Sequence, residues 1–111
     1  MKTVDHIAIR VPDLDLAQTW YEKYCGAVLS FKDQYYRRMT LNNTTIALID
    51  ENRYPDNHIG LLVENVEDLP SFGTIIEHRD GTIGSYVKDP FGNMVEYIWY
   101  SDEAKKKLNG A

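Results

Sequence analysis

Three residues of this sequence carry side chains that bind divalent metal ions, and they occupy matching places in a repeated pattern. His6 lies in residues 5–11 (DHIAIRV), and His58 lies 52 positions later in residues 57–63 (NHIGLLV). Glu96 lies in residues 94–98 (MVEYI), which align with residues 45–49 (TIALI) at an offset of 49. Two imidazoles and one carboxylate can bind one side of a divalent ion and leave its other positions open, as in non-haem Fe(II) oxygenases. The sequence predicts such a site, with Fe²⁺ favoured and Mn²⁺, Zn²⁺ or Ni²⁺ as further candidates.

The elements that carry these residues must turn them in one direction. In a strand, alternate residues face opposite sides, so apolar residues packed beneath a helix would turn His6, His58 and Glu96 to the opposite, concave face. The apolar residues that would face the helices are Ile7, Ile9 and Val11 in the first half, then Ile59, Leu61 and Val63 in the second. In the last strand Val95, Tyr97 and Trp99 share the face opposite Glu96.

Both halves of the chain show the same predicted order of strand, helix and three strands. The first half has strands at 3–11, 27–32, 35–41 and 44–49 and a helix at 14–25. The second half has strands at 57–64, 75–79, 82–88 and 93–100 and a short helix at 66–73 that contains Pro70. In the first helix Leu16, Trp20 and Tyr24 form the expected apolar stripe, and Gly26 the C-terminal cap. The fold class is therefore α+β, with two βαβββ modules in tandem.

The expected domain organisation is a single domain over residues 1–111. Module 1 covers about 3–51, module 2 about 57–100, and a C-terminal helix 101–109. The composition, with 43% apolar and 26% charged residues, is that of a soluble globular protein. A net charge of −5, with no basic cluster before Lys105, argues against nucleic acid binding. No long apolar run or signal peptide is visible, and Cys25 stands alone, so we expect no membrane association and a cytoplasmic location.

The double module and residues 86–96 (YVKDPFGNMVE) resemble the vicinal-oxygen-chelate superfamily over residues 3 to about 100. That group includes glyoxalase I, methylmalonyl-CoA epimerase, extradiol dioxygenases, fosfomycin-resistance enzymes and bleomycin-binding proteins. The resemblance implies a glyoxalase/bleomycin-resistance/dioxygenase-like fold with metal ligands on the first and last strands of each module. Three of the four positions hold His6, His58 and Glu96. The fourth holds Ala47, which cannot coordinate and so disfavours glyoxalase and epimerase activity.

A second match favours the dioxygenase-like branch. The extradiol pattern has a histidine, a tyrosine, Asp-Pro-x-Gly and the ligand glutamate, matched here by His78, Tyr86, residues 89–92 and Glu96. The resemblance implies that His78 and Tyr86 donate hydrogen bonds to a metal-bound oxyanion. The additional acid/base histidine of those enzymes has no counterpart, and Ser85 replaces an expected apolar residue. From the residues alone, His78 could equally face solvent and Tyr86 could serve only in packing.

Three cations are candidates for substrate binding. Arg10 lies two residues beyond His6, Arg38 alternates with the core residue Met39, and Lys88 shares the parity of Tyr86. Cations near a metal suit an anionic or enolisable, oxygen-rich substrate, although the same residues could lie in water at strand ends.

These observations predict a small metal-dependent enzyme, dioxygenase-like, that acts on a small molecule able to chelate the ion through oxygen. One alternative is a metal-free small-molecule-binding protein of the bleomycin-resistance type, and another is a glyoxalase-like lyase or isomerase. We also expect a homodimer. The site could lie within one chain, or His6 of one chain could complete a site with His58 and Glu96 of the other.

Overall fold

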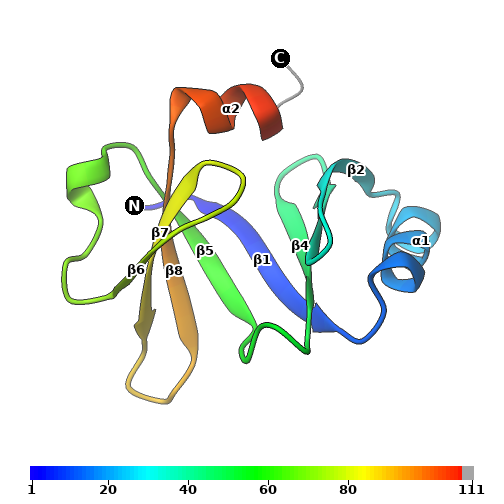
Figure 1. Cartoon of the computed structure of the whole chain (residues 1–111), viewed down its shortest axis with the longest axis horizontal. Coiled ribbons are helices and arrows are strands. Elements are labelled where there is room, and N and C mark those ends of the chain that lie inside the picture. The colour runs from blue at the N-terminus through cyan, green and yellow to red at the C-terminus, as the bar shows by residue number, and fades with distance from the viewer. Residues whose placement is uncertain (109–111) are drawn as a thin grey trace.

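The computed structural model describes residues 1–108, which form one eight-stranded mixed sheet and two α-helices (Figure 1). The strand order is β2-β3-β4-β1-β5-β8-β7-β6. The elements are β1 (Val4–Val11), α1 (Leu14–Cys25), β2 (Val28–Lys32), β3 (Tyr36–Thr40), β4 (Thr45–Asp50), β5 (His58–Val63), the 3₁₀ turn Val66–Asp68, β6 (Thr74–Glu77), β7 (Thr82–Lys88), β8 (Met94–Tyr100) and α2 (Asp102–Leu108). The α+β class and the tandem order of the elements are those predicted.

Antiparallel pairing of β1 with β5 joins the two halves of the sheet within one chain. Each half places its first strand parallel to its last: β1 beside β4, and β5 beside β8. In Figure 1 the two halves diverge from this central pair. A hollow lined by residues of both halves lies between them. Residues from β1, β5 and β8, which are neighbours in the sheet, therefore face the same hollow.

Helix α1 begins at its cap Asp13, whose carboxylate accepts a hydrogen bond from the Leu16 amide at 3.0 Å. It ends at Gly26, whose φ of 66° is the left-handed conformation that glycine adopts without strain. Below the helix is a core of Val11, Ala27, Met39 and Leu48.

The predicted apolar stripe of α1 is wrong. Leu16, Trp20 and Tyr24 are 69%, 51% and 63% exposed. The residues that contact the core are instead Leu14, Ala17 and Tyr21, at i, i+3 and i+7. The small side chain of Ala17 allows the helix to lie close to the sheet, which explains why this face and not the larger aromatic one packs inward.

The second predicted helix, at 66–73, is only a 3₁₀ turn over Val66–Asp68. Pro70 explains the difference, because it disfavours helical geometry at the preceding residue, and Leu69 is extended with ψ 129°. The segment is fastened by Ser85, whose hydroxyl donates to the Pro70 carbonyl at 2.7 Å. This contact gives the polar residue at 85 a structural role.

Coverage of the outer face of the sheet is consequently incomplete. Ile9 and Val11 pack in the core below α1, as expected. Ile7 and Ile59, also expected beneath helices, are 41% and 48% exposed.

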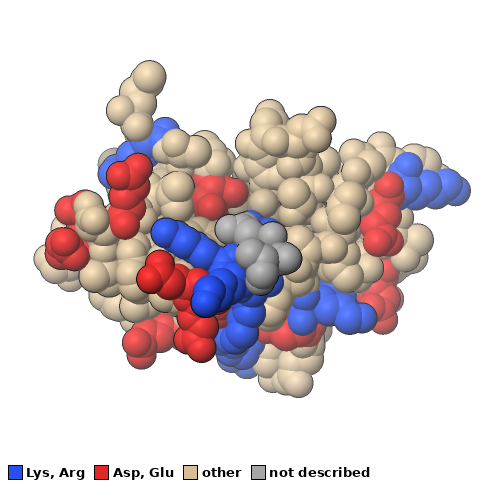
Figure 2. Space-filling model, turned by 90° about the horizontal axis from the view of Figure 1, so that it is seen from above, with Lys and Arg blue, Asp and Glu red and all other residues tan. Residues whose placement is uncertain are grey.

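Helix α2 spans the open side of the hollow and contacts both β2 and β8 (Figure 1). Ala104 is fully buried and Leu108 is 2% exposed, while the Leu108 carbonyl accepts a hydrogen bond from Arg38 Nη1 at 3.1 Å. The helix was predicted to reach residue 109, which lies outside the described residues. On the face seen in Figure 2, Lys and Arg side chains lie next to Asp and Glu side chains. No helix within residues 1–108 is long and apolar enough to cross a membrane.

Candidate metal centre

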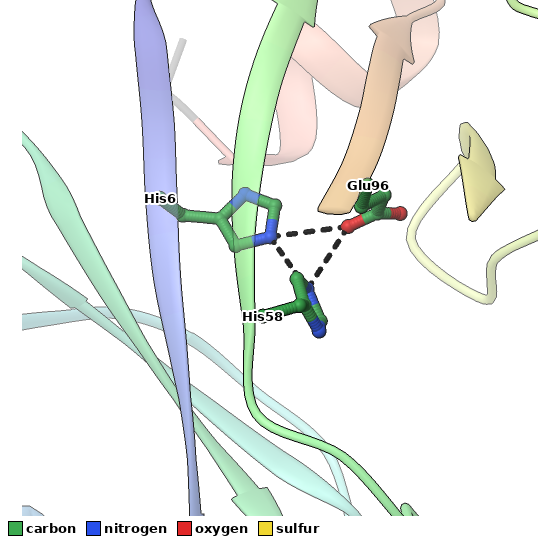
Figure 3. A group of neighbouring side chains, drawn as sticks. All are labelled: His6, His58 and Glu96. Atoms are coloured by element: carbon green, nitrogen blue, oxygen red, sulfur yellow. Dashed lines mark hydrogen bonds and ion pairs between the residues drawn. The ribbon is translucent and has the colours of Figure 1, made fainter. Parts of the chain in front are cut away.

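Three side chains converge at the centre of the hollow, one from each of three neighbouring strands (Figure 3). His6 comes from β1, His58 from β5 and Glu96 from β8. His6 Nε2 lies 3.0 Å from His58 Nε2, and Glu96 Oε1 lies 3.1 Å from each of these nitrogens. All three residues belong to one chain, so the arrangement shared between two chains is not needed to bring them together.

The nature of these donor atoms indicates the kind of ion that the centre could hold. Two imidazole nitrogens and one carboxylate oxygen are ligands that divalent first-row ions accept. The three ligand atoms lie within 4.8 Å of one another, so one ion could contact all three. The donor set thus fits a divalent ion.

The centre is buried and its charges are coupled. Glu96 is 2% exposed and His6 is 7% exposed. Burial alone would raise the pKa of Glu96, but hydrogen bonds from His58, His6 and His78 hold it well below its usual value. Burial alone would lower the pKa of His6, but hydrogen bonds to Asp5 and Glu96 outweigh it and raise the pKa to about 9. In the metal-free protein the cluster is therefore a charged, proton-binding group.

Two glycines create the space for these side chains. A Cβ atom on Gly60, which pairs with His6 across the β1–β5 ladder, would collide with the His6 imidazole. A Cβ on Gly84 of β7 would collide with the Glu96 carboxylate. The sequence analysis did not identify either glycine as part of the site. A glycine inside a strand often marks such a close approach, and this signal was available.

His78 and Tyr86 lie beside the triangle. His78 Nε2 is 2.7 Å from Glu96 Oε2 and 3.2 Å from the Tyr86 hydroxyl. The His78 side chain is 21% exposed and is therefore only partly open to solvent. Burial, followed by the charge of Glu96, raises the pKa of Tyr86, which keeps its hydroxyl protonated. Glu96 therefore presents one oxygen to His6 and His58 and the other to His78.

Asp5 and Tyr100 extend the cluster on the other side of His6. Asp5 Oδ2 is 2.8 Å from His6 Nδ1 and accepts a hydrogen bond from the Tyr100 hydroxyl at 2.7 Å. The sequence analysis missed both residues. Tyr100 could have been found, because it follows Glu96 by four residues on the same strand face.

A cavity of about 930 Å³ surrounds the centre. Part of its wall is apolar, and hydroxyl and carboxylate groups from other elements complete it. The apolar lining comprises Ala47, Ile49, Ile76, Met94, Ile98 and Leu108, and the polar lining includes Tyr36, Tyr54, Asp80 and Tyr86. Its volume is that of a small-molecule site.

The three predicted substrate-binding cations are placed differently from one another. Arg38 and Lys88 line the cavity. Arg38 is held by Ser30 and Leu108, whereas Lys88 is exposed. Arg10, by contrast, is exposed and is not among the described residues that line the cavity. Its guanidinium donates to the carbonyls of Tyr54 and Glu51 at 2.7 and 3.1 Å, because the segment between the modules passes over the end of β1.

The strand register also shows which residue of the first module is equivalent to Glu96. Gly60 pairs with Glu96 in the second module, and Ala8 pairs with Ala47 in the first. Ala47 is thus the register equivalent of Glu96, and it offers only a methyl group.

Comparisons with known proteins agree with this architecture. The sequence profile of the Glyoxalase/Bleomycin resistance protein/Dioxygenase superfamily matches residues 3–97. Among curated proteins, none matches this sequence.

Several solved structures share the fold at low identity. A hypothetical protein, BH1468 from Bacillus halodurans C-125, has a TM-score of 0.71 at 11% identity, covering 91% of this chain and 96% of that one. A variant of Streptomyces coelicolor methylmalonyl-CoA epimerase, in complex with 2-nitronate-propionyl-CoA, has a TM-score of 0.70 at 15% identity, with coverage of 92% and 97%. A superfamily member from Vibrio splendidus 12B01 has a TM-score of 0.64 at 11% identity, with coverage of 89% and 99%.

At these identities the structures establish the fold alone. The profile match covers most of the chain, and the tandem modules and the strand order have the same architecture. This chain belongs to the Glyoxalase/Bleomycin resistance protein/Dioxygenase superfamily, the vicinal-oxygen-chelate group.

Proposed function

We propose that this protein is a metal-dependent enzyme, dioxygenase-like in its site, that acts on a small molecule able to chelate the ion through oxygen. The observation that carries the proposal is the triangle of His6 Nε2, His58 Nε2 and Glu96 Oε1, with edges of 3.0 and 3.1 Å, inside a cavity of about 930 Å³. A donor set of two histidines and one carboxylate favours Fe²⁺, with Mn²⁺, Zn²⁺ or Ni²⁺ as further candidates.

A bound ion would supply Lewis acidity and, if it is iron, a route to oxygen chemistry. The other roles belong to the protein. His78 holds the second oxygen of Glu96 and so leaves only Oε1 for coordination. Tyr86 keeps its proton and can donate a hydrogen bond to an oxygen of the substrate on which negative charge develops.

The cavity wall bears on the kind of substrate. Apolar side chains such as Ile49 and Met94 line the cavity around the centre. Lys88 supplies positive charge at the cavity wall, and Arg38 supplies it near α2. This combination suits a compact molecule with adjacent oxygens at one end and an apolar or anionic remainder.

The first test is elemental analysis of protein purified anaerobically without an affinity tag. We expect about one Fe, Mn, Zn or Ni per chain in the wild type and loss of that metal in His58→Ala. The matched control is Ile59→Ala, at the neighbouring exposed position of the same strand, which should leave the metal content unchanged.

A wild-type protein that binds no metal after anaerobic reconstitution would contradict the proposal. The cavity would then be that of a metal-free binding protein, to be screened for small-molecule ligands. If the protein retains a metal with no redox chemistry, the glyoxalase-like lyase or isomerase alternative gains support. Ala47 at the fourth ligand position disfavours that alternative.

The homodimer, the cytoplasmic location and the single domain over residues 1–111 stay predictions. The exposed stripe of Leu16, Trp20 and Tyr24 on α1 supports an association surface, because contiguous apolar patches on soluble proteins often mark interaction sites.

A further inference from the structure

Within residues 1–108, a carboxylate lies within hydrogen-bond distance of Nδ1 in only one of the two histidines of the candidate centre. His6 Nδ1 lies 2.8 Å from Asp5 Oδ2, and the side chains of His6 and Asp5 are 9% and 14% exposed. Within residues 1–108, no hydrogen bond to Nδ1 of His58 is found. The two imidazoles therefore differ in how firmly their rings are oriented.

A β-bulge brings Asp5 to this position. Regular alternation would turn Asp5 away from the cavity, because its neighbour His6 faces inward. The pairing register shifts between Val4, opposite Leu61, and His6, opposite Gly60. Two steps along β1 thus match one step along β5, and Asp5 is the extra residue. Bulges change the direction of a side chain in this way, and Asp5 lines the cavity.

Tyr100 holds the carboxylate in place. Its hydroxyl donates to Asp5 Oδ2 at 2.7 Å, the same oxygen that faces His6 Nδ1. Tyr100 is at the end of β8, the strand that also carries Glu96. A chain of hydrogen bonds therefore runs from the end of β8 through the bulge of β1 to the imidazole.

This series of hydrogen bonds has a chemical consequence for His6. A carboxylate that accepts from Nδ1–H leaves the lone pair of a neutral imidazole on Nε2, the atom that faces His58 and Glu96. We propose that Asp5, held by Tyr100, is a positioning residue that fixes the tautomer and ring orientation of His6 and thereby sets the affinity of the site for a divalent metal. This inference rests on the proposed metal site.

The test compares apparent dissociation constants for Mn²⁺ and Co²⁺, measured by chelator competition on the full chain. We expect Asp5→Ala to weaken binding about 10- to 100-fold, the range found for such supporting groups. Asp5→Asn, which keeps an acceptor oxygen, should lose less, and Tyr100→Phe should also weaken binding. The matched control is Tyr36→Phe, because the Tyr36 hydroxyl also bonds a carboxylate, Asp80, at 3.0 Å, but not one that touches a proposed ligand. It should leave the constant unchanged within about twofold.

A second readout needs no metal. Nitrogen chemical shifts of the His6 ring, recorded at a pH where the ring is neutral, report which nitrogen carries the proton. We expect Nδ1–H in the wild type and a substantial Nε2–H fraction in Asp5→Ala. A merely structural role of Asp5 would not change this tautomer, and Asp5→Asn and Tyr100→Phe provide the comparison if Asp5→Ala does not fold.

The outcomes separate the two proposals. A wild type that binds metal, with Asp5→Ala binding it equally well, would overturn the positioning role alone. A wild type that binds no metal would overturn the proposed function, and the tautomer would then decide whether Asp5 orients His6. An unchanged tautomer in Asp5→Ala overturns the inference in either case.

Discussion

The two oxygens of the Glu96 carboxylate have different neighbours. Oε1 faces His6 and His58, whereas Oε2 lies 2.7 Å from His78 Nε2. A carboxylate divided in this way cannot turn to chelate an ion with both oxygens without losing the contact to His78. The single residue thus links the proposed ligands to the groups expected to handle the substrate.

Proton binding by the metal-free centre predicts a stability optimum in mildly acidic solution. The pKa of His6 is raised from 6.5 to about 9, so its stabilising contribution is complete below pH 6.5 and is lost as the pH rises through 9. The pKa of Glu96 is lowered from 4.5, so its contribution is complete above pH 4.5 and is lost as the pH falls through the lowered value. We expect urea unfolding of metal-free protein to give the largest free energy between about pH 4.5 and 6.5.

The control for this prediction is His6→Gln, which should remove the decline above pH 6.5 and keep the decline at low pH. A wild-type free energy of unfolding that stays constant between pH 6.5 and 9 would contradict it. Metal competes with the same proton, so apparent metal affinity should rise with pH up to about 9, the pKa of His6.

Sequence patterns identified the proposed ligands but not their surroundings. His6, His58 and Glu96 could be found because the repeat and the strand alternation are both visible in the order of residues. Asp5 could not, since its direction depends on the pairing register between β1 and β5, which no local pattern records.

At the scale of elements, three neighbouring strands carry the side chains of the centre. Glycines at two strand positions leave room for those side chains. Gly60 and Gly84 provide these gaps on β5 and β7. The equivalent of Gly60 in the first module is Ala8, which is buried and pairs with His58 across the same ladder. The two modules therefore share an architecture, but His6 lies opposite a glycine and His58 lies opposite an alanine.

A pair of matched glycine substitutions tests this role. Gly60→Ala should displace the His6 imidazole and weaken metal binding about tenfold or more. Gly26→Ala, where φ is 66° and no atom lies near the added Cβ, should cost about 1–2 kcal/mol of stability and leave metal affinity unchanged. Chelator competition and urea unfolding on both variants give the two quantities. Equal metal affinity in the two variants would show that the gap at Gly60 is not needed.

Most elements were predictable from periodicity and turn residues, within about one or two residues at their ends. Two features were not. Helix α1 carries two overlapping apolar stripes, and only packing against the sheet selects Leu14, Ala17 and Tyr21. The pattern that predicted a helix at 66–73 was weak. Pro70 favours an extended conformation at Leu69, and this ends the turn after Asp68.

At the scale of the whole molecule, α2 connects the two halves of the sheet. Ser101, just before the helix, donates to the Gly81 carbonyl at 3.0 Å on one side, and Arg38 holds the Leu108 carbonyl on the other. Leu108 is at once part of the interior and part of the cavity wall. Sequence patterns indicated a final helix but gave no sign that it closes the site.

Replacing Leu108 should therefore affect stability and cavity together. We expect Leu108→Ala to lower the free energy of unfolding by about 2–5 kcal/mol, the usual cost for a buried leucine. Lys106→Ala, on the exposed side of the same helix, should change it by less than about 0.5 kcal/mol. Urea unfolding measures both. If the two variants are equally stable, α2 does not close the molecule in solution.

The three proposed ligands lie at positions 6, 58 and 96, so they are spread over nearly the whole length of the sequence. In the unfolded chain these positions are far apart, and an ion can bind all three only after β1, β5 and β8 have found one another. Such an ion would bind the folded state and not the unfolded one. A free metal concentration about a hundred times the dissociation constant would then add about 2.7 kcal/mol to the free energy of unfolding. A simple melting curve would therefore rank candidate metals by affinity before any substrate is known.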